Sequence, residues 1–129
     1  MRIQRKQTIE DELIIENSKG EETLRLPVKL HVDAILADYN RQRKLLGEFQ
    51  YKVAEDPMSE EALMALGMCI VSFFKLIFGE EGGEKLLDFY ENRYTEMLED
   101  VAPYVVEVIQ PQIDAAMRQR AERYKKLSK

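Results

Sequence analysis

The feature that most constrains the fold of this chain is a nearly unbroken apolar run at residues 63–78. Its apolar side chains cover almost the whole circumference of a helix, and such a helix lies at the centre of a domain or is covered by a partner. The run has 16 residues and contains Lys75, so it falls short of the roughly 20 apolar residues that span a membrane. Ser59 offers a hydroxyl cap at its start and Gly79 a stop at its end. We therefore predict a buried helix over residues 59–78 and no membrane association.

Residues 7–30 are predicted to form a β-hairpin, because two segments alternate apolar and polar residues with the period of a strand. Residues 17–20 separate the two segments and make Gly20 available for a positive φ. A four-residue turn at this place pairs Leu13 with Leu24. Since an isolated hairpin is marginal in water, its apolar face must meet helices or another chain. Three residues of that face are candidates for partner binding: Leu24, Leu26 and Val28.

The rest of the chain has apolar residues at helical spacing and is predicted to hold about four helices. Pro57 ends the first of them, since the residue before a proline avoids the helical region. Pro111 predicts a kink inside the last one, because it lacks the N–H that bonds the carbonyl of Glu107. The predicted bounds are 32–55, 59–78, 84–99 and 101–127. The expected fold is α+β and mainly α: an N-terminal β-hairpin followed by about four helices at 32–127, in a single domain over residues 1–129.

Charge is unevenly distributed along the chain. With 24 acidic and 19 basic residues the net charge is −5, which disfavours a surface that is coated by nucleic acid. Acidic residues dominate at 80–100, whereas six bases and two acids occupy residues 114–129. The basic C-terminal end at 118–129 fits three interpretations: a solvated helix end that suits the helix dipole, a docking site for an acidic protein surface, or a nucleic-acid site. Its candidate residues are Arg118, Arg120, Arg123, Lys125 and Lys126.

The residues that carry most enzyme and metal chemistry are scarce in this sequence. His31 is its one histidine and Cys69 its one cysteine, too few for an intrachain disulfide or a closed zinc site. The glycines at 79, 82 and 83 lie among glutamates, and the Gly-Lys-Ser/Thr of a phosphate loop is absent. We therefore predict no enzyme activity, no catalytic or metal-binding residues and no cofactor. The lone cysteine fits a reducing cytoplasm.

Apolar surface is the other functional signal in the sequence. Six methionines, a helix that is apolar all round and a hairpin that needs cover favour adaptable contacts with other polypeptides. An ordinary core explains the same residues, and both interpretations stay open at this point.

The order of these elements carries a family resemblance. The apolar helix runs into Phe78-Gly79-Glu80-Glu81, the segment Leu86-Leu87-Asp88-Phe89-Tyr90 follows, and a long helix with a basic end closes the chain. Over most of its length the chain resembles the small tail assembly chaperones of long-tailed phages and Gram-positive prophages.

The resemblance implies a non-enzymatic role in phage tail assembly. Such chaperones coat the tape measure protein before and while tail tube subunits polymerise around it, and they then leave. The implied partners are the tape measure protein and the tail tube protein, with self-association as a further expectation. The implied location is the cytoplasm of the bacterial host and not the mature virion. Two alternatives stay open: a nucleic-acid-associated regulator that uses the basic C-terminal helix, and a head-tail structural component.

Overall fold

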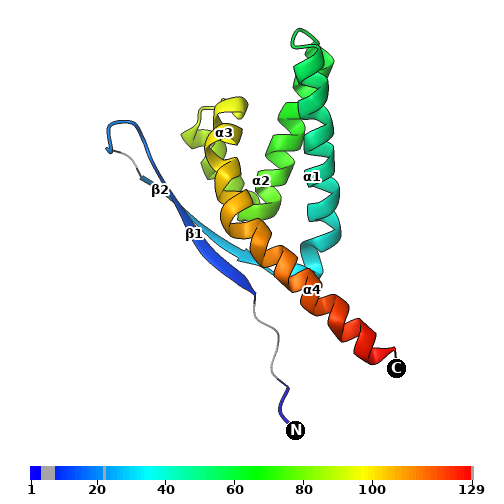
Figure 1. Ribbon diagram of the computed structural model, residues 1–129. Helices are drawn as coiled ribbons and strands as arrows, with labels where there is room; N and C mark the ends of the chain where they lie inside the picture. Colours follow the sequence, from blue (N-terminus) through cyan, green and yellow to red (C-terminus); the bar gives the residue numbers. More distant parts are fainter. Residues whose placement is uncertain (4–7, 22, 129) are drawn as a thin grey trace.

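The computed structural model describes residues 1–3, 8–21 and 23–128 as a two-stranded hairpin followed by helices (Figure 1). This confirms the predicted α+β, mainly α fold. The elements are β1 (Ile9–Glu16), β2 (Thr23–Leu30), α1 (Val32–Glu55), α2 (Glu60–Phe89), α3 (Tyr94–Tyr104), the π-helical segment η1 (Val105–Ile109) and α4 (Gln110–Leu127). Residue 7, the predicted start of the hairpin, and Lys129, the last residue of the basic end, lie outside the described residues.

The two strands are antiparallel, but their register differs from the prediction by two residues. Leu13 pairs with Leu26, not with Leu24, because six residues rather than four separate Glu16 from its partner Thr23. The turn begins as expected: Gly20 has φ 70°, and its N–H donates to the Asn17 carbonyl at 2.9 Å. A shift of two residues keeps every side chain on its predicted face, since faces alternate with period two.

The apolar face of the hairpin packs on the helices, chiefly through contacts between β2 and α2. Leu26, Val28 and Leu30 are at most 3% exposed and join the same core cluster as Phe74 and Ile77 of α2. The sequence left open whether helices or another chain cover the apolar face of the hairpin. In this structure, helices cover it.

The helical geometry of the central helix is interrupted at Gly79, where the sequence predicts its end: Gly79 has φ 81° and ψ 169°, outside the helical region. A second helical part of α2 follows this kink and runs to Phe89. The predicted helix at 84–99 is wrong in its bounds, because this second part ends at Phe89 and α3 begins at Tyr94. The true reversal follows α2, where Glu91 and Asn92 have φ of 52° and 60°, and the Asn92 N–H donates to the carbonyl of Leu87 at 3.0 Å. This bond spans the helix end like the long bond of a Schellman motif.

One continuous rod, α3–η1–α4, closes the fold, so the predicted helix start near residue 101 is also wrong. The expected irregularity before Pro111 takes the form of a π-helical turn rather than a break. There the Gln110 N–H donates to the carbonyl of Val105, five residues back. The Gln112 side-chain amide donates to the Val108 carbonyl at 2.8 Å, which satisfies an acceptor in the disturbed turn.

Two tyrosines tie the rod to the rest of the fold. The hydroxyl of Tyr104 donates to the carboxylate of Asp11 on β1 at 2.7 Å. The hydroxyl of Tyr39, a fully buried residue of α1, donates to the side-chain oxygen of Gln110. Ile113 is the last buried residue of α4, so the remaining turns of this helix extend beyond the core (Figure 1).

Candidate functional site

Two surfaces stand out among the described residues, and the first is a groove between α1 and α2. These helices lie side by side and run in opposite directions (Figure 1). The groove has a volume of about 310 Å³. We call it the α1–α2 groove, and its lining residues are Arg41, Gln42 and Leu45 from α1 and Met68, Cys69 and Ser72 from α2.

Uncovered apolar side chains continue from the groove along α2. Met64 and Met68 are 71% and 70% exposed and lie one helical turn apart, and Leu45 across the groove is 38% exposed. Only a third of the most apolar 18-residue window of α2 is buried. By length and composition alone, α2 would be able to cross a membrane. Contiguous apolar surface of this kind usually marks a contact with another molecule.

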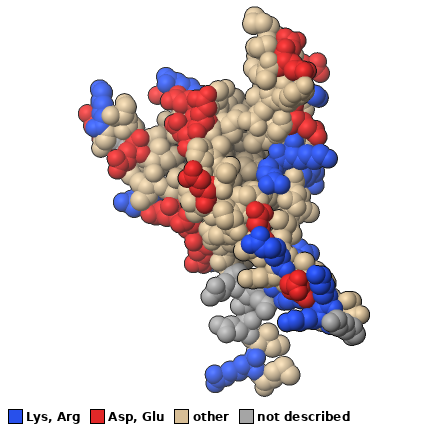
Figure 2. Space-filling view, in the orientation of Figure 1, with Lys and Arg blue, Asp and Glu red and all other residues tan. Residues whose placement is uncertain are grey.

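The α1–α2 groove has a buried amide oxygen among its lining residues and an uneven distribution of charge around it. The side-chain oxygen of Gln42 is buried and has no hydrogen-bond partner among the described residues. Lys and Arg gather over the middle of α1, where Arg41 of the groove pairs with Asp38 (Figure 2). Acidic side chains gather instead where α1 ends and α2 begins, at the top of Figure 2. Burial raises the pKa of the Cys69 thiol, which keeps this thiol protonated at neutral pH.

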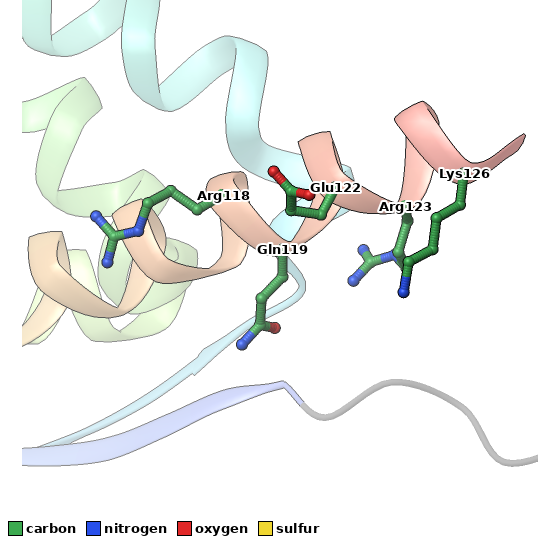
Figure 3. A pocket seen from close by; sticks show the side chains of 5 residues that line it. All are labelled: Arg118, Gln119, Glu122, Arg123 and Lys126. Carbon is green, nitrogen blue, oxygen red and sulfur yellow. The ribbon is translucent and has the colours of Figure 1, made fainter. Parts of the chain in front are cut away.

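The second surface is the basic face of α4. A shallow groove of about 380 Å³ lies along one side of this helix, and Arg118, Gln119, Glu122, Arg123 and Lys126 line it. Their spacing of one, three or four residues places them in a stripe along the helix. Figure 3 shows the side chains of Gln119, Arg123 and Lys126 on the same side of α4. Three cations against one carboxylate make this face suited to an anionic partner.

The other two predicted basic residues lie beside this face and are engaged within the chain. Arg120 is 3.8 Å from a carboxylate oxygen of Asp33, and its guanidinium lies 5.6 Å from the centre of the Tyr124 ring. Lys125 pairs with Glu122 at 3.3 Å. The structure therefore brings all five predicted basic residues onto one exposed helix end, with Arg120 partly covered.

The predicted hairpin residues are not on a free surface. Leu26 and Val28 are 0% and 2% exposed, and Leu24 is half-buried against the same core. They lie on a different element from the basic residues of α4. In this structure their apolar contacts are already made inside the chain.

Sequence reasoning missed the α1–α2 groove as a place, although it had noted the methionines and the all-round apolar helix. The usable signal was the i, i+4 spacing of Met64 and Met68, which continues to the polar Ser72 and so places the two methionines on the side of the helix that carries a hydroxyl. Among the described residues, no three of His, Cys, Asp and Glu lie together in a way that could hold a metal ion.

No protein-family model, no curated protein and no solved structure matches this chain.

Proposed function

We propose that this chain is a non-enzymatic assembly chaperone that holds a largely helical client, in the manner of the phage tail assembly chaperones that it resembles. The client is the tape measure protein, and tail tube subunits displace the chaperone as they polymerise. The observation that carries the proposal is the uncovered apolar stripe of α2, with Met64 and Met68 about 70% exposed beside the α1–α2 groove.

The chemistry of this surface fits a helical client. A groove between two helices accepts the apolar face of an amphipathic helix, which presents side chains at i, i+3 or i+4, and i+7. Methionine side chains are flexible and polarisable, so they adapt to the varied sequence of a long client. Such contacts give moderate affinity, which allows displacement during assembly.

The test is co-expression with the tape measure protein encoded in the same phage or prophage. The wild-type chain should keep this protein soluble and co-purify with it. Met64→Glu with Met68→Glu should lose both effects, because two buried charges in the contact are costly. Val106→Glu is the matched control, since Val106 is 65% exposed on η1, outside both grooves. A tape measure protein that stays insoluble with the wild-type chain would contradict the proposal.

The basic face of α4 favours a second candidate, a nucleic-acid-associated regulator. Phosphate contacts by Arg118, Arg120 and Arg123 predict DNA retention that weakens steeply with salt. Replacing these three residues by glutamate should abolish it. A third hypothesis is that the chain is a head-tail structural component. It predicts that the chain is found in purified virions, whereas a chaperone is absent from them.

A further inference from the structure

The rod α3–η1–α4 and the end of α2 give the molecule two ends of opposite charge. All eight acidic residues between positions 80 and 100 are exposed, against two bases in the same stretch, Lys85 and Arg93. At the other end of the rod, residues 118–128 hold five bases and one acid. Figure 2 shows acidic side chains over the region of α3 and basic side chains along the end of α4.

The two ends cannot meet within one chain. They lie at opposite ends of a helical rod that is continuous from Tyr94 to Leu127. Its 34 residues span about 50 Å at 1.5 Å per residue, and a continuous helix does not fold back on itself. The rod therefore keeps the cations of the basic face out of reach of the acidic end. There, Lys75, Lys85 and Arg93 pair with five of the eight acidic residues and leave an excess of negative charge.

From this arrangement we infer that the basic face of α4 docks on the acidic end of a second copy of the chain, head to tail. The second copy carries the complementary charge, and no other partner has to be assumed. Arg118, Arg123 and Lys126 have no ion-pair partner among the described residues, so they are available for this contact. Tyr124 and Leu127, 58% and 78% exposed, add apolar area beside them.

The contact is heterologous, because two different surfaces meet. A head-to-tail series of any length keeps one free basic face at one terminus and one free acidic end at the other, so association continues until a ring closes or as an open chain. Its strength depends on ionic strength, since exposed charges are screened over about 10 Å at 0.1 M salt and about 3 Å at 1 M. This inference does not depend on the proposed chaperone function, and it leaves the α1–α2 groove open.

Charge reversal tests the inference. The first variant reverses the basic face with Arg118→Glu, Arg123→Glu and Lys126→Glu. The second reverses the acidic end with Asp88→Lys, Glu96→Lys and Glu99→Lys; of these, Glu96 pairs with Arg93 at 3.6 Å, and that pair is exposed. Glu80, Glu84 and Asp100 are spared because they bond to Lys75 or Tyr90. A control carries the same charge change as the first variant at exposed residues elsewhere: Lys19→Glu, Lys29→Glu and Lys44→Glu. Circular dichroism checks that all of them fold.

Sedimentation velocity at low ionic strength is the measurement. The wild-type chain and the control should associate as concentration rises, with an association constant that falls at least about tenfold in high salt. Each reversed variant alone should be monomeric. An equimolar mixture of the two should associate again, because the second variant's basic face meets the first variant's acidic end.

Three results would overturn the inference. They are a wild-type chain that is monomeric at low ionic strength, association that survives both reversals, and a mixture of the two variants that stays monomeric. If the wild-type chain is monomeric and its basic face instead retains DNA, the nucleic-acid reading of α4 replaces the inference.

Discussion

Gly83 lies directly against Lys75. A Cβ atom built on Gly83 would be 2.5 Å from Cγ and 3.2 Å from Cα of Lys75. The bend at Gly79 turns the last part of α2 back far enough for this approach, and the Lys75 ammonium then pairs with Glu80 at 3.1 Å and Glu84 at 2.8 Å. Two glycines with different roles, one conformational and one steric, thus shape the acidic end of the molecule.

Replacing Gly83 by alanine should destabilise the fold by about 1–3 kcal/mol, the usual cost of overpacking. The added methyl group meets backbone and the base of a side chain that two carboxylates hold, so the neighbour cannot move away easily. Gly47→Ala is the control: no atom of the described residues lies within 4 Å of its added Cβ, and alanine favours a helix interior by about 1 kcal/mol. Urea unfolding should therefore move the two midpoints in opposite directions.

Replacing Gly79 by alanine should also destabilise the fold, for a conformational reason alone. Its added Cβ meets nothing within 4 Å, but φ 81° with ψ 169° is a region that only glycine adopts readily. The expected cost is about 1–3 kcal/mol, measured by urea unfolding. An unchanged midpoint would mean that α2 can straighten at this point without loss, and the bend would then not be a requirement of the fold.

The hairpin shows what a period-two pattern can and cannot determine. Alternation assigned the faces of Leu13 and Leu26 correctly, because every residue two positions on lies on the same face. The register depends on where the turn ends, and Glu21 gave no sign that the loop extends beyond Gly20. Its N–H donates to the Asn17 side chain at 2.9 Å, a contact that lengthens the turn.

The helix ends were harder to predict than the helices themselves. Glycine at 79 marks a true interruption of the helix, but a second helical part of α2 follows directly and was not predicted with its bounds. The true reversal uses left-handed Glu91 and Asn92, and a glutamate in that conformation leaves no sequence signal. Pro111 did mark an irregularity, but a missing N–H alone does not determine its form, which here is a π-helical turn.

The candidate site also has one part that the sequence predicts and one part that it does not. Basic residues at 118–126 could be assigned to one exposed helix end, since their charge and spacing are local properties. The α1–α2 groove needs the angle and distance between two helices, which set how far Leu45 and Met68 stand apart. The burial of Leu26 likewise followed from its face only once the helix that covers it was known.

A bound client should protect Cys69 from thiol reagents. This residue lines the α1–α2 groove and is the only cysteine, so labelling reports on this place alone. Because burial raises the pKa of its thiol, labelling of the free chain should be slower than that of an exposed thiol and should speed up as pH rises. Addition of the tape measure protein should slow it at least about tenfold if occupancy exceeds about nine-tenths. Equal rates with and without bound client would place the client elsewhere.

The hydrogen bond from Tyr104 to Asp11 should make stability fall at alkaline pH. Burial, and then this bond to a carboxylate, raise the pKa of Tyr104 well above the ordinary 10.0. Above pH 10 the unfolded chain has lost the tyrosine proton while the folded chain keeps it, so the free energy of unfolding decreases as pH rises.

Tyr104→Phe should cost about 1 kcal/mol at neutral pH and show a shallower alkaline fall, so its stability curve should approach that of the wild type. Asp11→Asn keeps the buried hydroxyl but removes the carboxylate, and should show an intermediate slope. Tyr90, whose pKa burial and Asp100 also raise, keeps part of the fall in both variants. Urea unfolding measures the free energy of unfolding from neutral pH to above pH 10. If these free energies fall in parallel for the wild type and Tyr104→Phe, the bond does not hold this proton.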